Sequence, residues 1–114
     1  LILDTERNRF LTDRATFALN HVLFRGDALI FDELKSRRVR LYSAKSGHGV
    51  RMDFEGMQYL AIWSPANDSP FVCLEPWTGM ATCASEDDIF EHKRGVTVLE
   101  PGAETSFAFT VTVF

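Results

Sequence analysis

The sequence predicts an all-β fold, an antiparallel β-sandwich, from three observations. Short runs of alternating apolar and polar residues recur along the chain, and turns rich in Gly, Pro, Asn, Asp and Ser separate them. A helical spacing is found in only one short piece. The 114 residues, 46% of them hydrophobic, suffice for one domain with a modest core. Six or seven strands joined by short turns are typical of a sandwich.

The first third of the chain gives the weakest patterns. Residues 1–4 predict a strand edge, and residues 17–24 fit neither period, which favours a loop with a single helical turn. Asp27 follows a turn signal and is placed to cap what comes next. Apolar residues at a spacing of three then favour a short helix over residues 28–34.

The middle of the chain predicts three strands. Alternation over residues 39–42 and 50–55 indicates two half-buried strands, and the glycine-containing stretch 46–49 predicts the hairpin turn between them. Residues 59–63 are apolar on both faces, so this strand is expected at the centre of a sheet.

The last third predicts three further strands. Residues 71–75 form a short apolar run between Pro70 and Pro76, and pairing is expected to stop at Pro76 because proline lacks a backbone donor. Residues 96–99 predict a short strand. Residues 106–114 give the clearest alternation, with one face made of Phe107, Phe109, Val111 and Val113.

Glu75 is the candidate functional residue, because it ends an apolar strand and is followed by Pro76 and Trp77. Period two places it on one face with Phe71 and Cys73, an apolar neighbourhood that would raise its pKa and make it a better base. Trp77 offers a flat apolar surface on which a sugar ring can lie. The alternatives are a solvated acid at a strand end and a tryptophan used only for packing.

The net charge of −4 argues against nucleic acid or an anionic membrane surface as partner, and no apolar run approaches the ~20 residues of a membrane span. Neither a metal-ligand spacing nor another cofactor signal is seen, so no cofactor is expected. No signal peptide is visible, which predicts reduced Cys73 and Cys83 and a cytoplasmic location. The chain does not begin with Met, and we expect its N-terminus to be a cut.

Four blocks in the second half carry a family resemblance: Ala61-Ile62-Trp63-Ser64, Pro70-Phe71-Val72-Cys73-Leu74-Glu75-Pro76-Trp77-Thr78-Gly79, Glu91-His92-Lys93-Arg94-Gly95 and Leu99-Glu100-Pro101-Gly102. Together they resemble the aldose 1-epimerase (galactose mutarotase-like) family, in its bacterial branch with an EPW-G signature. The stretch 23–30 is similar to the same branch. Because family members are much longer, residues 1–114 resemble a single partial domain, the C-terminal portion of the family's large β-sandwich.

The resemblance implies that Glu75 is the general base, taking the proton of the anomeric hydroxyl while a histidine protonates the ring oxygen. It also implies that Asp27 binds sugar hydroxyls and that Trp77 lines the sugar site. The acid histidine of the family falls in the part that this chain lacks. His48 and His92 are expected to be solvated, and His21 to be a half-buried structural residue.

Three functions remain open on the sequence: an isomerase of free hexoses or a phosphosugar, a non-catalytic carbohydrate-binding sandwich, and a purely structural domain. A phosphosugar substrate would require arginines at the rim of the site. Arg37, Arg38 and Arg40 are candidates, but strand alternation would place Arg37 and Arg38 on opposite faces. A sandwich cut in this way would expose strand edges, through which we expect self-association.

Overall fold

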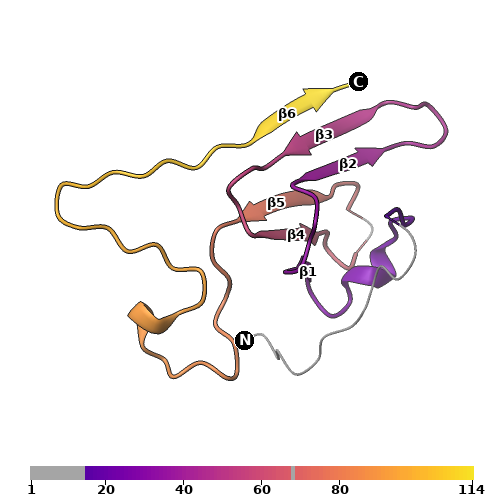
Figure 1. The fold of residues 1–114 in the computed structure, drawn as a ribbon. Helices are drawn as coiled ribbons and strands as arrows, with labels where there is room; N and C mark the ends of the chain where they lie inside the picture. The colour runs from indigo at the N-terminus through magenta and orange to yellow at the C-terminus, as the bar shows by residue number, and fades with distance from the viewer. Residues whose placement is uncertain (1–14, 68) are drawn as a thin grey trace.

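The computed structural model describes residues 15–67 and 69–114, and over these ranges it confirms the all-β fold (Figure 1). One sheet has the order β1-β4-β5 and a second has the order β2-β3-β6, with every pair antiparallel. The strands are β1 (Leu29–Phe31), β2 (Arg38–Tyr42), β3 (Gly49–Asp53), β4 (Tyr59–Trp63), β5 (Cys73–Trp77) and β6 (Thr110–Val113). Two single 3-10 turns, η1 (His21–Phe24) and η2 (Phe90–His92), complete the described elements. None of the described helices is long and apolar enough to cross a membrane.

The core lies between the two sheets. Leu60 and Ile62 of β4 enter it from the first sheet and Met52 of β3 from the second. Phe54, two residues after Met52, is fully buried just after β3, and its backbone N–H bonds to the carbonyl of Arg37 at the end of the β2–β3 pairing. The single turn η1 brings Phe24 into the same cluster, so the prediction of one helical turn in residues 17–24 is confirmed.

β4 is the central strand of its sheet, as the sequence predicted. Four of its five residues are buried, and it pairs with β1 on one side and β5 on the other. The short helix expected over residues 28–34 is wrong, since Leu29–Phe31 is strand β1. The spacing of three was misleading because Leu29 and Phe31, two residues apart, both pack on the core.

The second sheet begins with the predicted hairpin. β2 and β3 pair from Arg38↔Asp53 to Tyr42↔Gly49, and Gly47 takes a φ of +77° in the turn between them. Gly49 is required at the strand end, because a Cβ there would lie 2.2 Å from the carbonyl oxygen of Leu41. β6 then pairs with β3, with Val111 opposite Met52.

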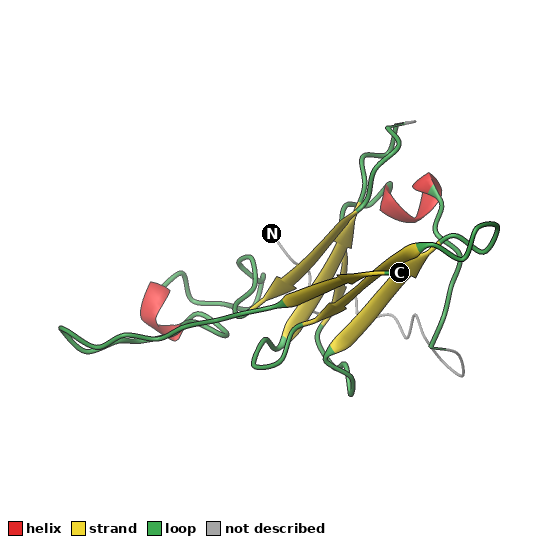
Figure 2. Cartoon of the chain, turned by 90° about the horizontal axis from the view of Figure 1, so that it is seen from above, coloured by secondary structure: helices red, strands yellow, loops and turns green. Residues whose placement is uncertain are grey.

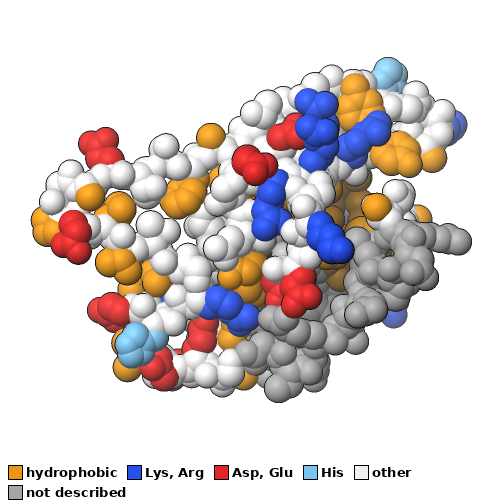
Figure 3. Space-filling view, viewed as in Figure 1, with side chains coloured by type: hydrophobic (Ala, Val, Ile, Leu, Met, Phe, Trp, Pro, Cys, Tyr) orange, Lys and Arg blue, Asp and Glu red, His pale blue; other side chains and the backbone are white. Residues whose placement is uncertain are grey.

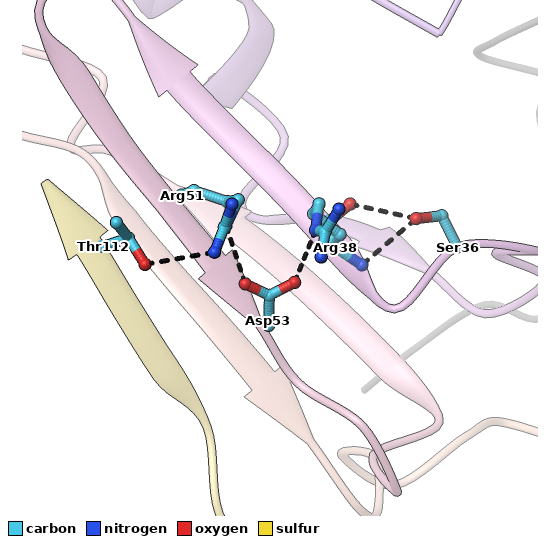
Figure 4. A network of polar contacts seen from close by, with 5 residues as sticks. All are labelled: Ser36, Arg38, Arg51, Asp53 and Thr112. Carbon is cyan, nitrogen blue, oxygen red and sulfur yellow. Dashed lines mark hydrogen bonds and ion pairs between the residues drawn. The ribbon is translucent and has the colours of Figure 1, made fainter. Parts of the chain in front are cut away.

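The outer face of the second sheet is polar and basic. The carboxylate of Asp53 accepts hydrogen bonds from Arg38 and Arg51, and Arg51 also donates to Thr112 of β6 (Figure 4). The hydrogen bond from Arg38, helped by the charges of Arg38 and Arg51, holds the pKa of Asp53 below its usual value. Arg40, directly opposite Arg51, lies 4.7 Å from the centre of the Phe114 ring. Basic side chains gather over this part of the molecule in Figure 3.

The connection from β5 to β6 is long and extends to one side of the strands (Figure 2). The strand expected at residues 96–99 is wrong, and of residues 106–114 only Thr110–Val113 is strand. The β-favouring residues at 96–99 were not enough, because no strand of the described chain pairs with that segment. The strand edge expected at residues 1–4 lies outside the described residues.

Candidate functional site

Glu75 lies in the middle of β5, where it is half-buried and directly opposite Ala61 of β4. Ala61 in turn is opposite Ile30 of β1, so the three residues form one row across the sheet. Neighbouring residues of a strand project to opposite faces, and Leu74 packs against the core. Glu75 therefore projects from the face of the first sheet that is turned away from the core, which we call the Glu75 face.

Aromatic residues flank Glu75 along both strands of this face. Trp77 is directly opposite Tyr59 on one side of the row, and Cys73 is opposite Trp63 on the other. Directly opposed residues project to the same side of a sheet, so all four share the Glu75 face. Tyr59 is buried, whereas Trp63 and Trp77 are half-buried and leave ring surface accessible. A carboxylate between two pairs that contain tryptophan is an arrangement that suits a sugar hydroxyl and an apolar sugar face together.

The prediction that pairing stops at Pro76 is wrong, because β5 continues to Trp77 and Pro76 is opposite Leu60. The missing N–H is tolerated because β5 is an edge strand of its described sheet, where a backbone nitrogen can point away from the neighbouring strand. The longer pairing matters for the site, since it fixes Trp77 on the same face as Glu75. At its other end the strand is shorter than predicted, and Phe71 lies outside it, with its ring centre 6.0 Å from that of Trp63.

An open cavity of about 540 Å³ lies at the end of β5. Its lining consists of Met57, Pro76, Trp77, Thr78, Gly79, Ala81 and Phe107. Trp77 thus borders the cavity, whereas Glu75 is not among the lining residues. Glu75 therefore lies on the aromatic face, two residues along β5 from the tryptophan that borders this cavity.

The structure places Asp27 outside the row of Glu75. Asp27 is exposed, lies in the turn before β1 with a φ of +95°, and its Oδ1 accepts a hydrogen bond of 2.8 Å from the backbone N–H of Ala28. Ile30, three residues later, is the member of β1 that shares the row of Glu75. The segment that Asp27 was expected to cap is strand β1, so the capping role is wrong, and the side chain bonds to the next backbone N–H instead.

The structure places the three histidines outside the strands of both sheets. His21 is half-buried, and its Nδ1 lies 3.1 Å from the carbonyl oxygen of Pro65, which confirms the structural role predicted for it. His48 is exposed in the hairpin turn, and exposed His92 lies 2.8 Å from the Asp87 carboxylate. None belongs to a strand of the first sheet.

Other groups expected near a site are also placed. Cys73 and Cys83 are both free thiols, as predicted. Arg38 and Arg40 lie on the outer face of the second sheet, and Arg37 donates to the carbonyl of Leu34. Residues 15–67 and 69–114 contain no group of three His, Cys, Asp or Glu side chains that could hold a metal ion.

Sequence reasoning missed the loop that packs against the buried end of this face. Gly95, with a φ of +76°, lies so close to the chain that a Cβ on it would come within 2.6 Å of the Thr78 carbonyl oxygen, 2.9 Å of Gly79 and 3.2 Å of the Tyr59 ring. The loop therefore packs on Tyr59 and on the residues that follow Trp77. The signal in the sequence was the pair of glycines 79 and 95, each of which is also part of a block that carried the family resemblance.

Glu86 holds this loop together. Its side chain is 15% exposed and accepts hydrogen bonds from the backbone N–H groups of Cys83 (3.0 Å) and Arg94 (3.3 Å), with Lys93 Nζ 3.6 Å away. The bond from the Cys83 N–H, followed by that from Arg94 and the charge of Lys93, holds the pKa of Glu86 below its usual value. The Arg94 guanidinium also contacts the buried Cys83 thiol.

We expect Glu86→Gln to lower the free energy of unfolding at pH 7 and to reduce the loss of that free energy when the pH is lowered. Since the pKa of Glu86 is lower in the folded protein than in the unfolded chain, its stabilisation is present above about pH 4.5 and is lost as the pH falls through the folded value. Urea unfolding of both proteins at pH 7 and pH 3 measures this. The difference between them should shrink at pH 3, and Glu104→Gln, at an exposed glutamate, is the control. An equal difference at both pH values would contradict this role.

We expect Gly95→Ala to destabilise the protein by about 1–3 kcal/mol more than Gly102→Ala, because only the first places a Cβ against the backbone. Both glycines have positive φ, at +76° and +82°, so the backbone strain is matched, and a Cβ on Gly102 meets nothing within 4 Å. Urea unfolding followed by tryptophan fluorescence compares the two. Equal losses would show that the loop does not pack on this face in solution.

Comparison with known proteins places the chain beside two bacterial proteins. It is 41% identical over 108 residues to Protein LacX, chromosomal, and equally to Protein LacX, plasmid, both of Lactococcus lactis subsp. lactis. The match covers 95% of this chain but 36% of each LacX protein, so the chain spans about a third of the length of these curated relatives. No model of a protein family matches the chain, and no solved structure matches it.

Proposed function

We propose that the chain is part of an aldose 1-epimerase-like isomerase that interconverts the anomers of a hexose. The observation that carries the proposal is the place of Glu75, a half-buried carboxylate on the face that also bears Trp63 and Trp77. The family resemblance of the blocks around Glu75 and Trp77 adds to this. The name LacX states no activity, so the 41% identity supports relatedness to those proteins and no particular reaction.

In this proposal Glu75 acts as the base. Its carboxylate takes the proton from the hydroxyl on C1, the C1–ring-oxygen bond breaks, and a histidine gives a proton to the ring oxygen. The open aldehyde rotates about C1–C2 and recloses with the proton transfers reversed, so no atoms are gained or lost. Trp77 provides a surface for the sugar ring beside the base. Asp27, three residues ahead of the row of Glu75, is the remaining candidate for a sugar hydroxyl.

The histidine comes from polypeptide outside these 114 residues. None of the three histidines lies in a strand of the Glu75 face: His21 contacts Pro65, just after β4, His48 is in the hairpin turn, and His92 is next to Asp87. An acid and a base must both be within hydrogen-bond reach of one sugar. The chain by itself therefore supplies the base half of the reaction.

A free hexose is favoured over a phosphosugar. Arg38, Arg40 and Arg51 lie on the outer face of the second sheet, whereas Glu75 lies on the outward face of the first. The two sets project from opposite sides of the sandwich, so these arginines do not provide a phosphate site beside Glu75.

The alternative function is a carbohydrate-binding sandwich without turnover. The observation that favours it is the absence of a histidine beside Glu75 among the described residues, together with the accessible tryptophans. Both functions predict sugar binding on the Glu75 face, and only the isomerase predicts a rate that depends on Glu75.

We expect Glu75→Gln to lower the rate of mutarotation by roughly 10²- to 10⁴-fold, the usual contribution of a general base. The test uses a chimera in which this chain replaces the matching region of Lactococcus lactis LacX, and polarimetry follows the anomers of glucose and galactose. Sugar-induced changes in tryptophan fluorescence should persist, since the amide keeps the shape of the side chain. Glu104→Gln, at an exposed glutamate in the connection between β5 and β6, is the control. Binding with no Glu75-dependent rate would favour the binding module, and neither binding nor rate would contradict both functions.

The isolated chain is expected not to reach the rate of that chimera in polarimetry, because it lacks the acid partner of Glu75. Tryptophan fluorescence in the same samples reports whether sugar still binds. A full rate from the 114 residues alone would overturn the proposed division of the acid and the base between two parts of a longer polypeptide.

A further inference from the structure

The inward face of β6 is exposed. Val111 is directly opposite Met52 of β3 and Val113 is opposite Val50, so both valines project to the side of the second sheet that carries the core. Met52 is 8% exposed, yet Val111 is 48% and Val113 is 78% exposed. The first sheet therefore covers β3 but does not reach across to β6.

This uncovered surface continues along the chain before β6. Phe107 and Phe109 continue the alternation of Val111 and Val113, and they are 48% and 54% exposed. We call these four residues the apolar strip. Phe107 also lines the cavity at the end of β5, together with Met57 and Trp77. Several apolar side chains are visible along the connection before β6 in the space-filling view, among acidic and other side chains (Figure 3).

The other face of the same segment has a different chemistry. Thr110 is opposite Asp53, and Thr112 is opposite Arg51 and accepts a hydrogen bond from it. β6 thus has one polar face, whose side chains contact other residues of the chain, and one apolar face, which remains exposed. β6 is also an edge strand of its described sheet, so one side of its backbone is available for pairing. Contiguous exposed apolar surface beside an unpaired strand edge marks a protein-binding surface.

We propose that the apolar strip docks β-strands from polypeptide equivalent to the part of the LacX proteins that this chain does not match. The two LacX proteins match 95% of this chain with 36% of their own length, so most of each relative has no counterpart in these 114 residues. The occupant has alternating apolar side chains, pairs with the free edge of β6, and places one bulky apolar side chain in the cavity of about 540 Å³ beside Phe107. A second copy of the chain is the competing occupant, and the test below distinguishes the two.

The test is co-expression of this chain, carrying an affinity tag, with the segment of Lactococcus lactis LacX that lies outside the matched region. We expect a one-to-one complex by size-exclusion chromatography with light scattering, and slower amide hydrogen exchange in β6. Val111→Thr with Val113→Thr keeps the side-chain shape and the strand propensity but removes apolar surface, and it should weaken the complex about tenfold or more. Thr110→Ser, on the polar face of the same strand, is the matched control and should leave it unchanged.

The two pieces of LacX itself, split at the same place, provide the positive control. The proposal is overturned if the LacX pieces associate and this chain does not join the LacX segment, or if neither pair associates. It is also overturned if the complex forms equally well with both valines replaced, or if the chain forms a homodimer that the valine replacements abolish. Far-ultraviolet circular dichroism of each variant shows that it is folded. The readout is association, so it stands or falls separately from the sugar chemistry, which polarimetry of the same complex measures.

Discussion

The register of β4 against β5 is the constraint on which the rest of the structure depends. Because Leu60 is opposite Pro76 and Ala61 is opposite Glu75, alternate residues of both strands go to the core and to the Glu75 face. A slip of one residue would reverse the faces of one of the two strands, so either Leu60 and Ile62 would turn outward or Glu75 would turn toward the second sheet. Burying an unpaired carboxylate is costly, as is exposing two large aliphatic side chains, so packing alone fixes which face carries the acid.

The loop after β5 packs against the buried end of the Glu75 face, and this packing restricts its backbone conformation. Gly95 has to lie against Gly79 and the Tyr59 ring, and it does so in a conformation that other residues rarely adopt. Glu86 stabilises that conformation by accepting hydrogen bonds from the backbone N–H groups of Cys83 and Arg94, which bound residues 83–94 of the loop. The polar contacts of this loop and the aromatic packing on the Glu75 face therefore depend on each other.

The sequence predicted the structure well wherever the residues of a strand were enough, by themselves, to indicate that strand. The hairpin of β2 and β3 was predicted because alternation and glycines coincide, and β4 because both of its faces are apolar. It was a poor guide where the partner decides the structure. Leu29–Phe31 forms a strand because β4 lies beside it and pairs with it. The apolar residues at 96–99 form no strand, because no strand of the described chain lies beside them. Pro76 stays in β5 because the strand is at an edge, which no local pattern reveals.

The same reasoning applies to the candidate site. Glu75 could be placed on one face with Cys73 by period two, whereas Trp77 could not, because pairing was expected to stop at Pro76. Asp27 could not, because its position depends on a turn with positive φ before β1. Tyr59 and Trp63 were visible only as apolar residues of a buried strand, and their place beside Glu75 follows from the register between two strands.

Trp77 lies between the Glu75 face and the apolar strip, the two surfaces of the structure that lack a partner among the described residues. Glu75 has no acid partner among the described residues, and the apolar strip has no cover. Trp77 shares the Glu75 face and also borders the cavity that Phe107 lines. Polypeptide docked on the strip and filling that cavity would reach the tryptophan two residues from the proposed base. Since a sandwich completes its core by adding strands, the packing that would cover Val111 and Val113 is also the means by which a second catalytic group would be held near Glu75.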